Sequence, residues 1–223
     1  MRTKLQDRQL PSYTKGEEIF NMVSHIFGSV IGITATVFLI IFSSIKSGVY
    51  EIVSSAIFGF TMILLYTMSS IYHGLKPNLA KKVFQVIDHC SIFMLIAGTY
   101  TTFSLCTLRE YNPALGWTVF GVVWGLAILG IILNAIDIKS FKVLSMVLYI
   151  GMGWCIVFTG KLIAQLLGPI GFTLLLCGGI AYTIGAVLYG LGKKKKYFHS
   201  VFHIFVVIGS ILHFMCIFFY VIQ

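Results

Sequence analysis

The chain has 223 residues, of which 58% are hydrophobic and only 10% are charged, and its mean hydropathy is +0.94. A soluble domain carries about 25% charged residues, so this composition excludes a soluble enzyme, a secreted domain and a disordered chain. The formal net charge is +9, and the positions of the basic residues decide whether this charge points to nucleic acid or to a membrane.

Long apolar segments predict membrane-spanning helices, because about 20 apolar residues cross the hydrocarbon core. In chain order, the expected helices of a seven-helix bundle lie at residues 20–44, 51–75, 83–107, 113–135, 143–166, 169–191 and 198–221. Gly168-Pro169 divides the stretch 143–192, because a single helix of that length would measure about 75 Å, far more than a bilayer needs. The runs do not alternate as barrel strands would, so the expected fold class is an all-α integral membrane protein.

Most lysine and arginine residues fall on one side of the predicted membrane. They lie in the N-terminal tail and after the second, fourth and sixth helices, whereas the other side holds only Lys46, Arg109 and Lys161. The positive-inside rule therefore places the N-terminus in the cytoplasm and the C-terminus outside. We expect residues 1–18 to form a short cytoplasmic or interfacial segment and residues 19–223 to form one transmembrane domain. The basic loops then face anionic lipid headgroups, so the expected partners are membrane lipids and not nucleic acid.

Histidines and one carboxylate gather at the cytoplasmic ends of several predicted helices. The members of this layer are His25, His73, Asp88, His89, His199 and His203. Asp88 lies about 8 Å into its helix from the same face, so these side chains share one depth in the membrane. Polar side chains inside a membrane are costly and usually functional, and the layer is therefore the candidate site.

The spacing within this layer indicates a metal site. His199 and His203 are four residues apart and project from one face of a helix, where they can chelate one small cation. Together with His73 they offer three neutral nitrogen atoms, and Asp88 adds an oxygen, either directly or through a water. Three protein ligands and a water are the usual pattern of catalytic zinc, so we expect Zn²⁺. Ser69 lies on the same helical face as His73.

A polar stripe on the first helix accompanies the site. Asn21, Ser24 and His25 follow Glu17 at spacings of three and four residues. Two interpretations stay open: these side chains surround the zinc site as a second layer of contacts, or they hold the first helix in place.

Two other histidines are not expected to bind the metal. His213 lies ten residues beyond His203, about 15 Å deeper in the membrane, and is expected to be a hydrogen-bonded core residue. His89 follows Asp88 in the sequence but points about 100° away from it on the helix.

Four short motifs carry a resemblance to a known family. They are Glu17-Glu18-Ile19-Phe20-Asn21-Met22-Val23-Ser24-His25, Ser69-Ser70-Ile71-Tyr72-His73, Asp88 early in the third helix, and His199-Ser200-Val201-Phe202-His203 with His213 behind it. From about residue 17 to its end, the chain resembles the bacterial hemolysin III proteins, the prokaryotic branch of the progestin and adipoQ receptor family. About 18 residues precede the first helix, where adiponectin receptors carry a long soluble region, so hormone recognition does not carry over.

The resemblance implies both an architecture and a site. It implies seven helices with the N-terminus inside, in the bacterial cell membrane, which agrees with the distribution of basic residues. It also implies a zinc ion held by His73, His199 and His203, with Asp88 bound through a water and Ser69 beside the site.

A mechanism for this site follows from its expected chemistry. Zinc lowers the pKa of a bound water and polarises a carbonyl, Asp88 is placed to accept a proton, and Ser69 is placed to donate a hydrogen bond to the carbonyl oxygen. The hypothesis is a zinc-dependent hydrolase of lipid amides or esters near the cytoplasmic leaflet, similar to what is proposed for ceramidase-like relatives of the family.

Other functions remain open on the sequence alone. One alternative is a regulator of membrane lipid homeostasis or energetics in which zinc only holds helices together. Another is a pore-forming hemolysin that causes cytolysis, although no amphipathic pore-lining helix is seen. Haem ligation by two histidines on different helices is a further alternative. A diiron desaturase would need more histidine motifs, and a retinal protein would need a lysine in the last helix.

Overall fold

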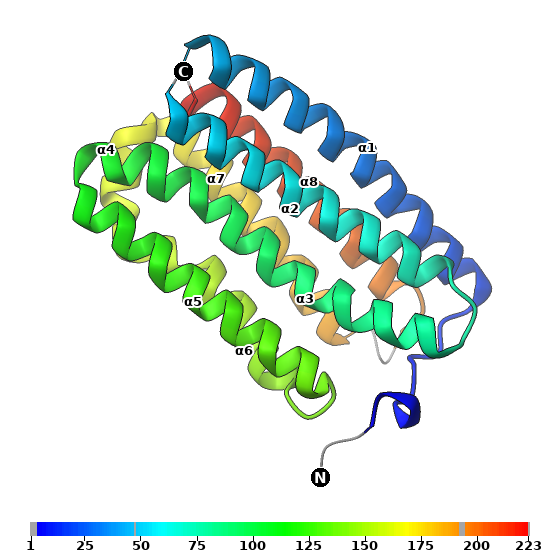
Figure 1. The fold of residues 1–223 in the computed structure, drawn as a ribbon. Helices are drawn as coiled ribbons and strands as arrows, with labels where there is room; N and C mark the ends of the chain where they lie inside the picture. Colours follow the sequence, from blue (N-terminus) through cyan, green and yellow to red (C-terminus); the bar gives the residue numbers. More distant parts are fainter. Residues whose placement is uncertain (1–3, 47, 192–194, 223) are drawn as a thin grey trace.

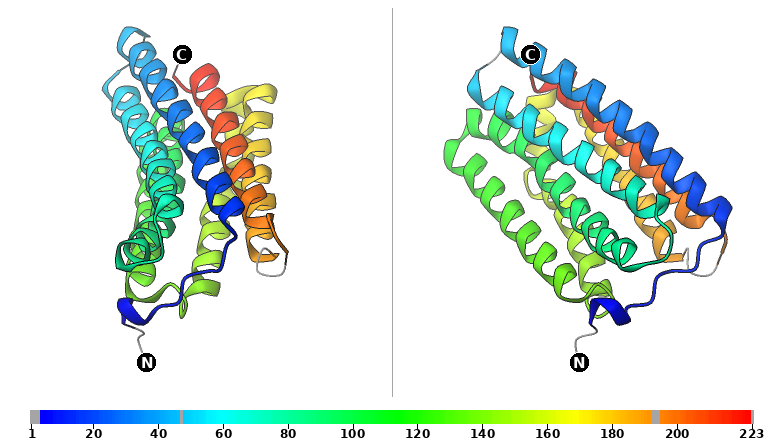
Figure 2. Two further views of the ribbon diagram at one scale, coloured as in Figure 1. Left: turned by 90° about the vertical axis from the view of Figure 1, so that its right-hand side faces the viewer. Right: turned by 45° about the vertical axis from the view of Figure 1, so that its right-hand side comes forward.

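The structure is a computed structural model that describes residues 4–46, 48–191 and 195–222, and within these ranges it contains helices and no strand (Figures 1 and 2). The elements are η1 (Leu5–Asp7), α1 (Lys15–Lys46), α2 (Val49–Gly74), α3 (Leu79–Thr102), η2 (Phe103–Leu108), α4 (Arg109–Tyr111), α5 (Pro113–Asp137), α6 (Lys142–Gly153), η3 (Cys155–Thr159), α7 (Gly160–Leu191) and α8 (Phe198–Tyr220). The all-α expectation is confirmed for these ranges. The predicted basic loop after the sixth helix lies partly outside them, at residues 192–194.

The first helix begins earlier than predicted. α1 starts at Lys15 rather than at residue 20, and its first turn contains Glu17 and Glu18. Hydropathy does not detect this turn because it is polar, but carboxylates are favourable at the positive end of a helix dipole. Both glutamates therefore stand on a helix at the edge of the bundle.

Local sequence sets the beginning of α5 as predicted. Pro113 occupies the first turn, where its missing N–H is not needed. The side chain of Asn112 accepts a hydrogen bond of 3.2 Å from the backbone N–H of Leu115 and so caps the helix.

The segment from α6 to α7 bears on the number of membrane spans. By length and composition, the described residues contain six helices able to cross a membrane, and Lys142–Leu191 is counted as one of them with 50 residues. This segment is not a regular helix: η3 interrupts it, and Gly168 has φ 68° and ψ 175°, immediately before Pro169. Figure 1 shows α6 beside α5 and the later part of α7 beside α8, so the chain changes direction within the segment.

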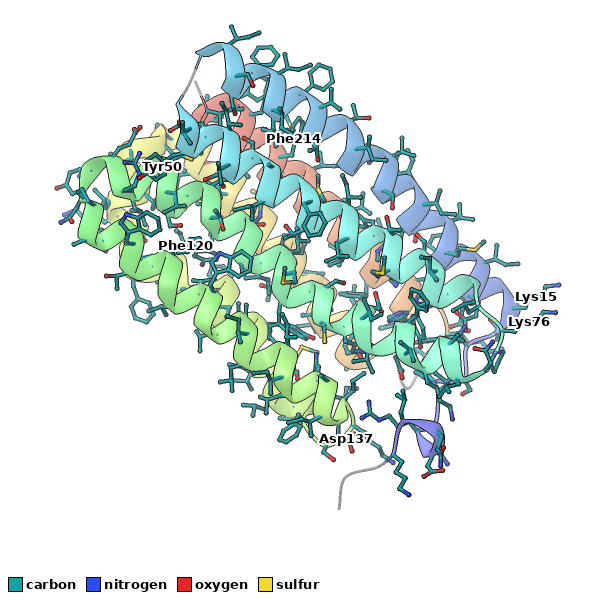
Figure 3. The ribbon with its side chains drawn as sticks, in the orientation of Figure 1. Lys15, Tyr50, Lys76, Phe120, Asp137 and Phe214 are labelled. Atoms are coloured by element: carbon teal, nitrogen blue, oxygen red, sulfur yellow. The ribbon has the colours of Figure 1, made fainter. Side chains whose placement is uncertain are left out.

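The two ends of the bundle differ in charge. Lys15, Lys76 and Asp137 lie toward one end, which is also the end of the N-terminus, and Tyr50 lies at the other (Figure 3). The C-terminus lies at the Tyr50 end (Figure 1). We call the end with Lys15 and Lys76 the basic end.

The helix α3 is the centre of the bundle. In the most apolar window of the candidate span Leu79–Tyr111, which comprises α3, η2 and α4, 83% of the residues are buried, against 50% or less in each other candidate span of the described residues. α5 packs against it closely, since a Cβ on Gly130 would lie 2.2 Å from the ring of Phe93. The outer helices instead expose large apolar side chains such as Val30 and Phe27, which is 61% exposed. A bilayer is the solvent that suits this surface.

Candidate metal centre

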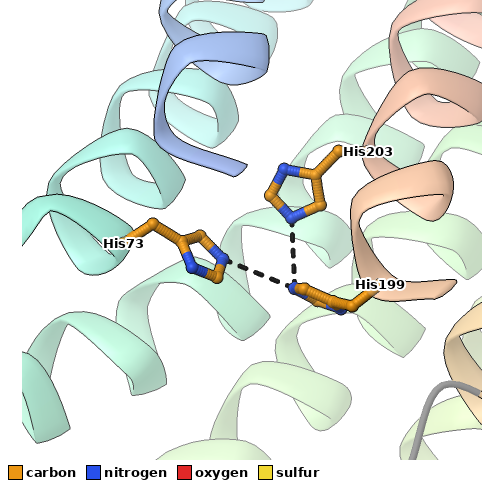
Figure 4. A group of neighbouring side chains, drawn as sticks. All are labelled: His73, His199 and His203. Carbon is orange, nitrogen blue, oxygen red and sulfur yellow. Dashed lines mark hydrogen bonds between the residues drawn. The ribbon is translucent and has the colours of Figure 1, made fainter. Parts of the chain in front are cut away.

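Three histidine side chains meet at the basic end of the bundle (Figure 4). His73 comes from the last turn of α2, and His199 and His203 come from the first two turns of α8. The Nε2 atom of His199 lies 3.4 Å from Nε2 of His73 and 3.1 Å from Nε2 of His203. All three residues are buried, and the nitrogen atoms that could bind a metal lie within 4.8 Å of one another. The structure thus brings together the three histidines that the sequence analysis selected.

The start of α8 is tied to the start of α1. The backbone N–H of Tyr197 donates a hydrogen bond of 2.8 Å to Oε1 of Glu17. Glu17 also accepts a hydrogen bond of 2.9 Å from the backbone N–H of Thr14. These bonds fix the first turn of α8, where His199 stands, against the N-terminal end of α1.

The orientation of His73 is set by a carboxylate that the sequence analysis did not assign to the site. Oε2 of Glu18 lies 2.6 Å from Nδ1 of His73, and Oε1 accepts a hydrogen bond of 2.6 Å from Nζ of Lys81. A carboxylate on the second ring nitrogen is the usual support of a metal-binding histidine, because it leaves the other nitrogen free to donate its lone pair. Glu18 lies three residues before Asn21 and seven residues before His25, so it shares a helical face with them. This spacing could have marked Glu18 as a residue of the site.

The predicted polar stripe of α1 lies against His203. Oγ of Ser24 is 3.4 Å from Nδ1 of His203, and the ring of His25 stacks on the ring of His203 with centroids 3.7 Å apart. The backbone of Asn21 is within hydrogen-bond reach of His203. Of the two interpretations of the stripe, these contacts favour direct support of the histidine cluster.

An aromatic residue covers the cluster from the basic end. The ring of Tyr13, which precedes α1, stacks on His199 with a centroid distance of 4.9 Å and an interplanar angle of 17°. It also lies 5.7 Å from the ring of His73. The sequence analysis missed Tyr13, because a single aromatic residue in a polar tail carries no periodic signal.

Asp88 lies beside the histidine cluster and not in it. It is outside the group whose nitrogen atoms lie within 4.8 Å of one another, but it lines the same cavity as His199 and His203. The side chain of Ser69 is within hydrogen-bond reach of its carboxylate, and Oδ2 lies 3.7 Å from Nδ1 of His89. The structure therefore places Asp88 and Ser69 together at the edge of the candidate site.

The two histidines that were not expected to bind a metal are engaged elsewhere. Nδ1 of His89 lies 2.8 Å from the carbonyl oxygen of Gln85, and Nε2 lies 3.2 Å from the hydroxyl of Tyr189. Nε2 of His213 lies 3.1 Å from the carbonyl oxygen of Leu175. His213 is thus the buried, hydrogen-bonded residue that was predicted, whereas His89 lies closer to Asp88 than its expected direction on the helix implied.

A cavity of about 150 Å³ extends from the histidine cluster into the bundle. A buried water needs about 10–15 Å³ measured in this way, so the cavity has room for a much larger molecule. Apolar side chains such as Ile92, Leu95 and Val206 form much of its wall, and polar side chains also line it, among them Asp88 and Ser69. This combination suits an amphiphile whose polar group lies near the histidines.

Comparison with known proteins finds relatives that cover most of the chain. The family model described as "Haemolysin-III related" matches residues 13–214. The chain is similar to "Hemolysin-3 homolog" of Bacillus subtilis (strain 168), with 39% identity over 211 residues, which are 95% of this chain and 97% of the relative. It is also similar to "Hemolysin-3" of Bacillus cereus, with 40% identity over 92% of both chains. The human "Monocyte to macrophage differentiation factor" is 24% identical over 90% of this chain and 83% of its own length. No solved structure matches the chain.

Proposed function

Since this chain belongs to the haemolysin-III related family and is a multi-pass protein of the cell membrane, we propose that it binds zinc at its histidine cluster and hydrolyses an amide or ester bond of a membrane lipid. The observation that carries the proposal is the meeting of three buried imidazoles at one end of a largely apolar cavity that also contains a carboxylate. A site of this kind brings a metal, a base and a lipid chain together.

The proposed topology has seven membrane crossings with the N-terminus in the cytoplasm. The left-handed φ of Gly168 and the change of direction within Lys142–Leu191 support two crossings in that segment. The basic end carries Lys15 and Lys76, and cytoplasmic loops are the ones enriched in lysine and arginine. The histidine cluster then lies near the cytoplasmic leaflet.

The donor atoms of the cluster fit zinc. Since Glu18 occupies Nδ1 of His73, the Nε2 atom of that ring presents a lone pair toward His199. Buried nitrogen lone pairs that face one another are unfavourable without a proton or a cation between them. Three neutral imidazoles with one open position are the ligand set of catalytic zinc. When bound, zinc would polarise a substrate carbonyl and lower the pKa of a water.

The chain's own groups supply the other parts of the reaction. Asp88 accepts the proton of the attacking water, because its carboxylate faces the same cavity as His203. Ser69 donates its single hydroxyl proton to the Asp88 carboxylate in the free protein. When substrate is bound, the hydroxyl turns and donates this proton to the carbonyl oxygen instead. The apolar walls hold the acyl chain and keep bulk water away from the reacting carbonyl.

The test of this function is hydrolysis by the purified full-length protein in detergent micelles with a panel of lipid amides and esters. We expect release of fatty acid that is lost after treatment with a chelator and restored by zinc. If the protein binds zinc but hydrolyses no lipid in the panel, this result would contradict the proposed enzyme activity and favour a regulator with a structural metal. Leakage of liposomes that persists in His203→Ala would instead favour a pore.

A further inference from the structure

The cavity that begins at the histidine cluster has a second polar group at its deeper end. His213, which lines its wall, is ten residues beyond His203 on the same helix, about 15 Å along the axis. Tyr182 of α7 lines the same part of the cavity. Neither residue has a role in the hydrolysis proposed above.

His213 carries a hydrogen-bond acceptor that lacks a donor. The residue is only 8% exposed, and its Nε2 atom donates a hydrogen bond of 3.1 Å to the carbonyl oxygen of Leu175. A neutral imidazole that donates through Nε2 has a bare acceptor at Nδ1. Among the described residues, Nδ1 has no hydrogen-bond partner. A buried acceptor without a donor is costly, so a ligand that supplies one is favoured here.

A hydrogen-bond donor stands next to this acceptor. The ring of Tyr182 lies edge-on to the ring of His213, with centroids 5.3 Å apart. Its hydroxyl lies 2.7 Å from Oγ of Ser210, which also accepts a hydrogen bond of 2.7 Å from the hydroxyl of Tyr66. When Tyr66 donates to Ser210 and Ser210 donates to Tyr182, the proton of Tyr182 is not used within this network.

Two glycines make room for these rings. A Cβ on Gly178 would lie 2.2 Å from Cδ2 of His213, and a Cβ on Gly209 would lie 2.9 Å from the ring of Tyr182. Each helix therefore has a glycine where the ring from the other helix packs. The donor and the acceptor are held in place by close packing of α7 against α8.

We propose that this end of the cavity binds a hydroxyl group carried partway along the apolar chain of an amphiphile. A hydroxyl both donates and accepts, so it can donate to Nδ1 of His213 and accept from the hydroxyl of Tyr182. The apolar side chains of the wall, which include Leu95 and Val206, accommodate the intervening methylene groups. The inference rests on the proposed function in taking the ligand to be a lipid, and it specifies that lipid as one with a hydroxylated acyl chain.

The test compares three fatty acids as probes: a long-chain acid with a hydroxyl in mid-chain, its unsubstituted parent, and the isomer with the hydroxyl next to the carboxyl group. Their dissociation constants are measured on the full-length protein in detergent by displacement of a fluorescent fatty acid. We expect the mid-chain hydroxy acid to bind about three- to tenfold more tightly than the parent, the gain of a net hydrogen bond. The other isomer should show no such gain.

Tyr182→Phe is the decisive variant, because it removes one oxygen atom and keeps the packed ring. It should reduce the preference for the mid-chain hydroxyl, because one of the two hydrogen bonds of that hydroxyl is lost, and leave the affinity for the parent acid unchanged, which also shows that the variant is folded. Tyr149→Phe, which removes another hydroxyl from the same cavity wall, is the matched control and should keep the preference.

Equal binding of the mid-chain hydroxy acid and its parent to the wild type, or a preference that is undiminished in Tyr182→Phe, would overturn the inference and leave His213 and Tyr182 as packing residues. Binding is measured without turnover, so this outcome is distinct from failure of the proposed function. A protein that prefers the mid-chain hydroxy acid but binds no zinc and hydrolyses no lipid would overturn only the proposed enzyme activity.

Discussion

Replacement of Asp88 by Asn is expected to reduce lipid hydrolysis by about 100- to 10,000-fold, the usual contribution of a general base. The amide has nearly the same shape as the carboxylate but cannot accept the proton of the attacking water. Asp88 lies outside the close histidine group, so the variant should retain much of its metal. Turnover and metal content are therefore measured on the same preparation.

The matched control for Asp88→Asn is Glu110→Gln, an exposed carboxylate on α4 at the opposite end of the bundle. It should hydrolyse lipid at the wild-type rate. Wild-type hydrolysis by Asp88→Asn would show that another group takes the proton. Loss of both metal and turnover would make Asp88 a metal-binding residue rather than a base.

Glu18→Gln is expected to weaken zinc binding by about 10- to 100-fold, as is usual for loss of a carboxylate behind a metal-binding histidine. The carboxylate lies 2.6 Å from Nδ1 of His73 and makes the ring a stronger ligand. A glutamine keeps the shape and an acceptor oxygen for Lys81, but it removes the negative charge. The dissociation constant is measured by competition with a zinc chelator.

Glu110→Gln is again the control for this measurement. Glu110 is an exposed carboxylate on α4, at the opposite end of the bundle from the histidine cluster. Its replacement should leave the zinc affinity close to that of the wild type. Equal affinities for Glu18→Gln and the wild type would show that Glu18 serves only to neutralise the buried Lys81.

Much of the fold could be predicted because a membrane limits the choice of structure. Backbone groups inside a bilayer must be satisfied within their own segment, so long apolar runs give helices and their approximate positions. The apolar run 20–44 does not include the first turn of α1, since this turn is polar and hydropathy responds only to apolar residues. The break at Gly168 was predicted from Gly168-Pro169 and is present as a left-handed φ.

The candidate site was predictable only in part. His199 and His203 share a helical face by their spacing, and His73 was expected at the same depth, so their meeting could be anticipated. Glu18 was not selected, because nothing in the sequence shows that it lies opposite His73. Tyr13 reaches His199 only through the path of the chain before α1, and no pattern in the sequence encodes that path.

The central claim is that the three histidines hold one zinc ion. It is tested most directly by the metal content of the purified full-length protein, measured by mass spectrometry beside the double variant His199→Ala/His203→Ala. We predict about one zinc ion per chain in the wild type and its loss in the double variant, which lacks two of the three imidazole ligands. Wild-type protein that is purified without chelators and contains no metal would contradict the account, and the cluster would then be a network of hydrogen-bonded histidines.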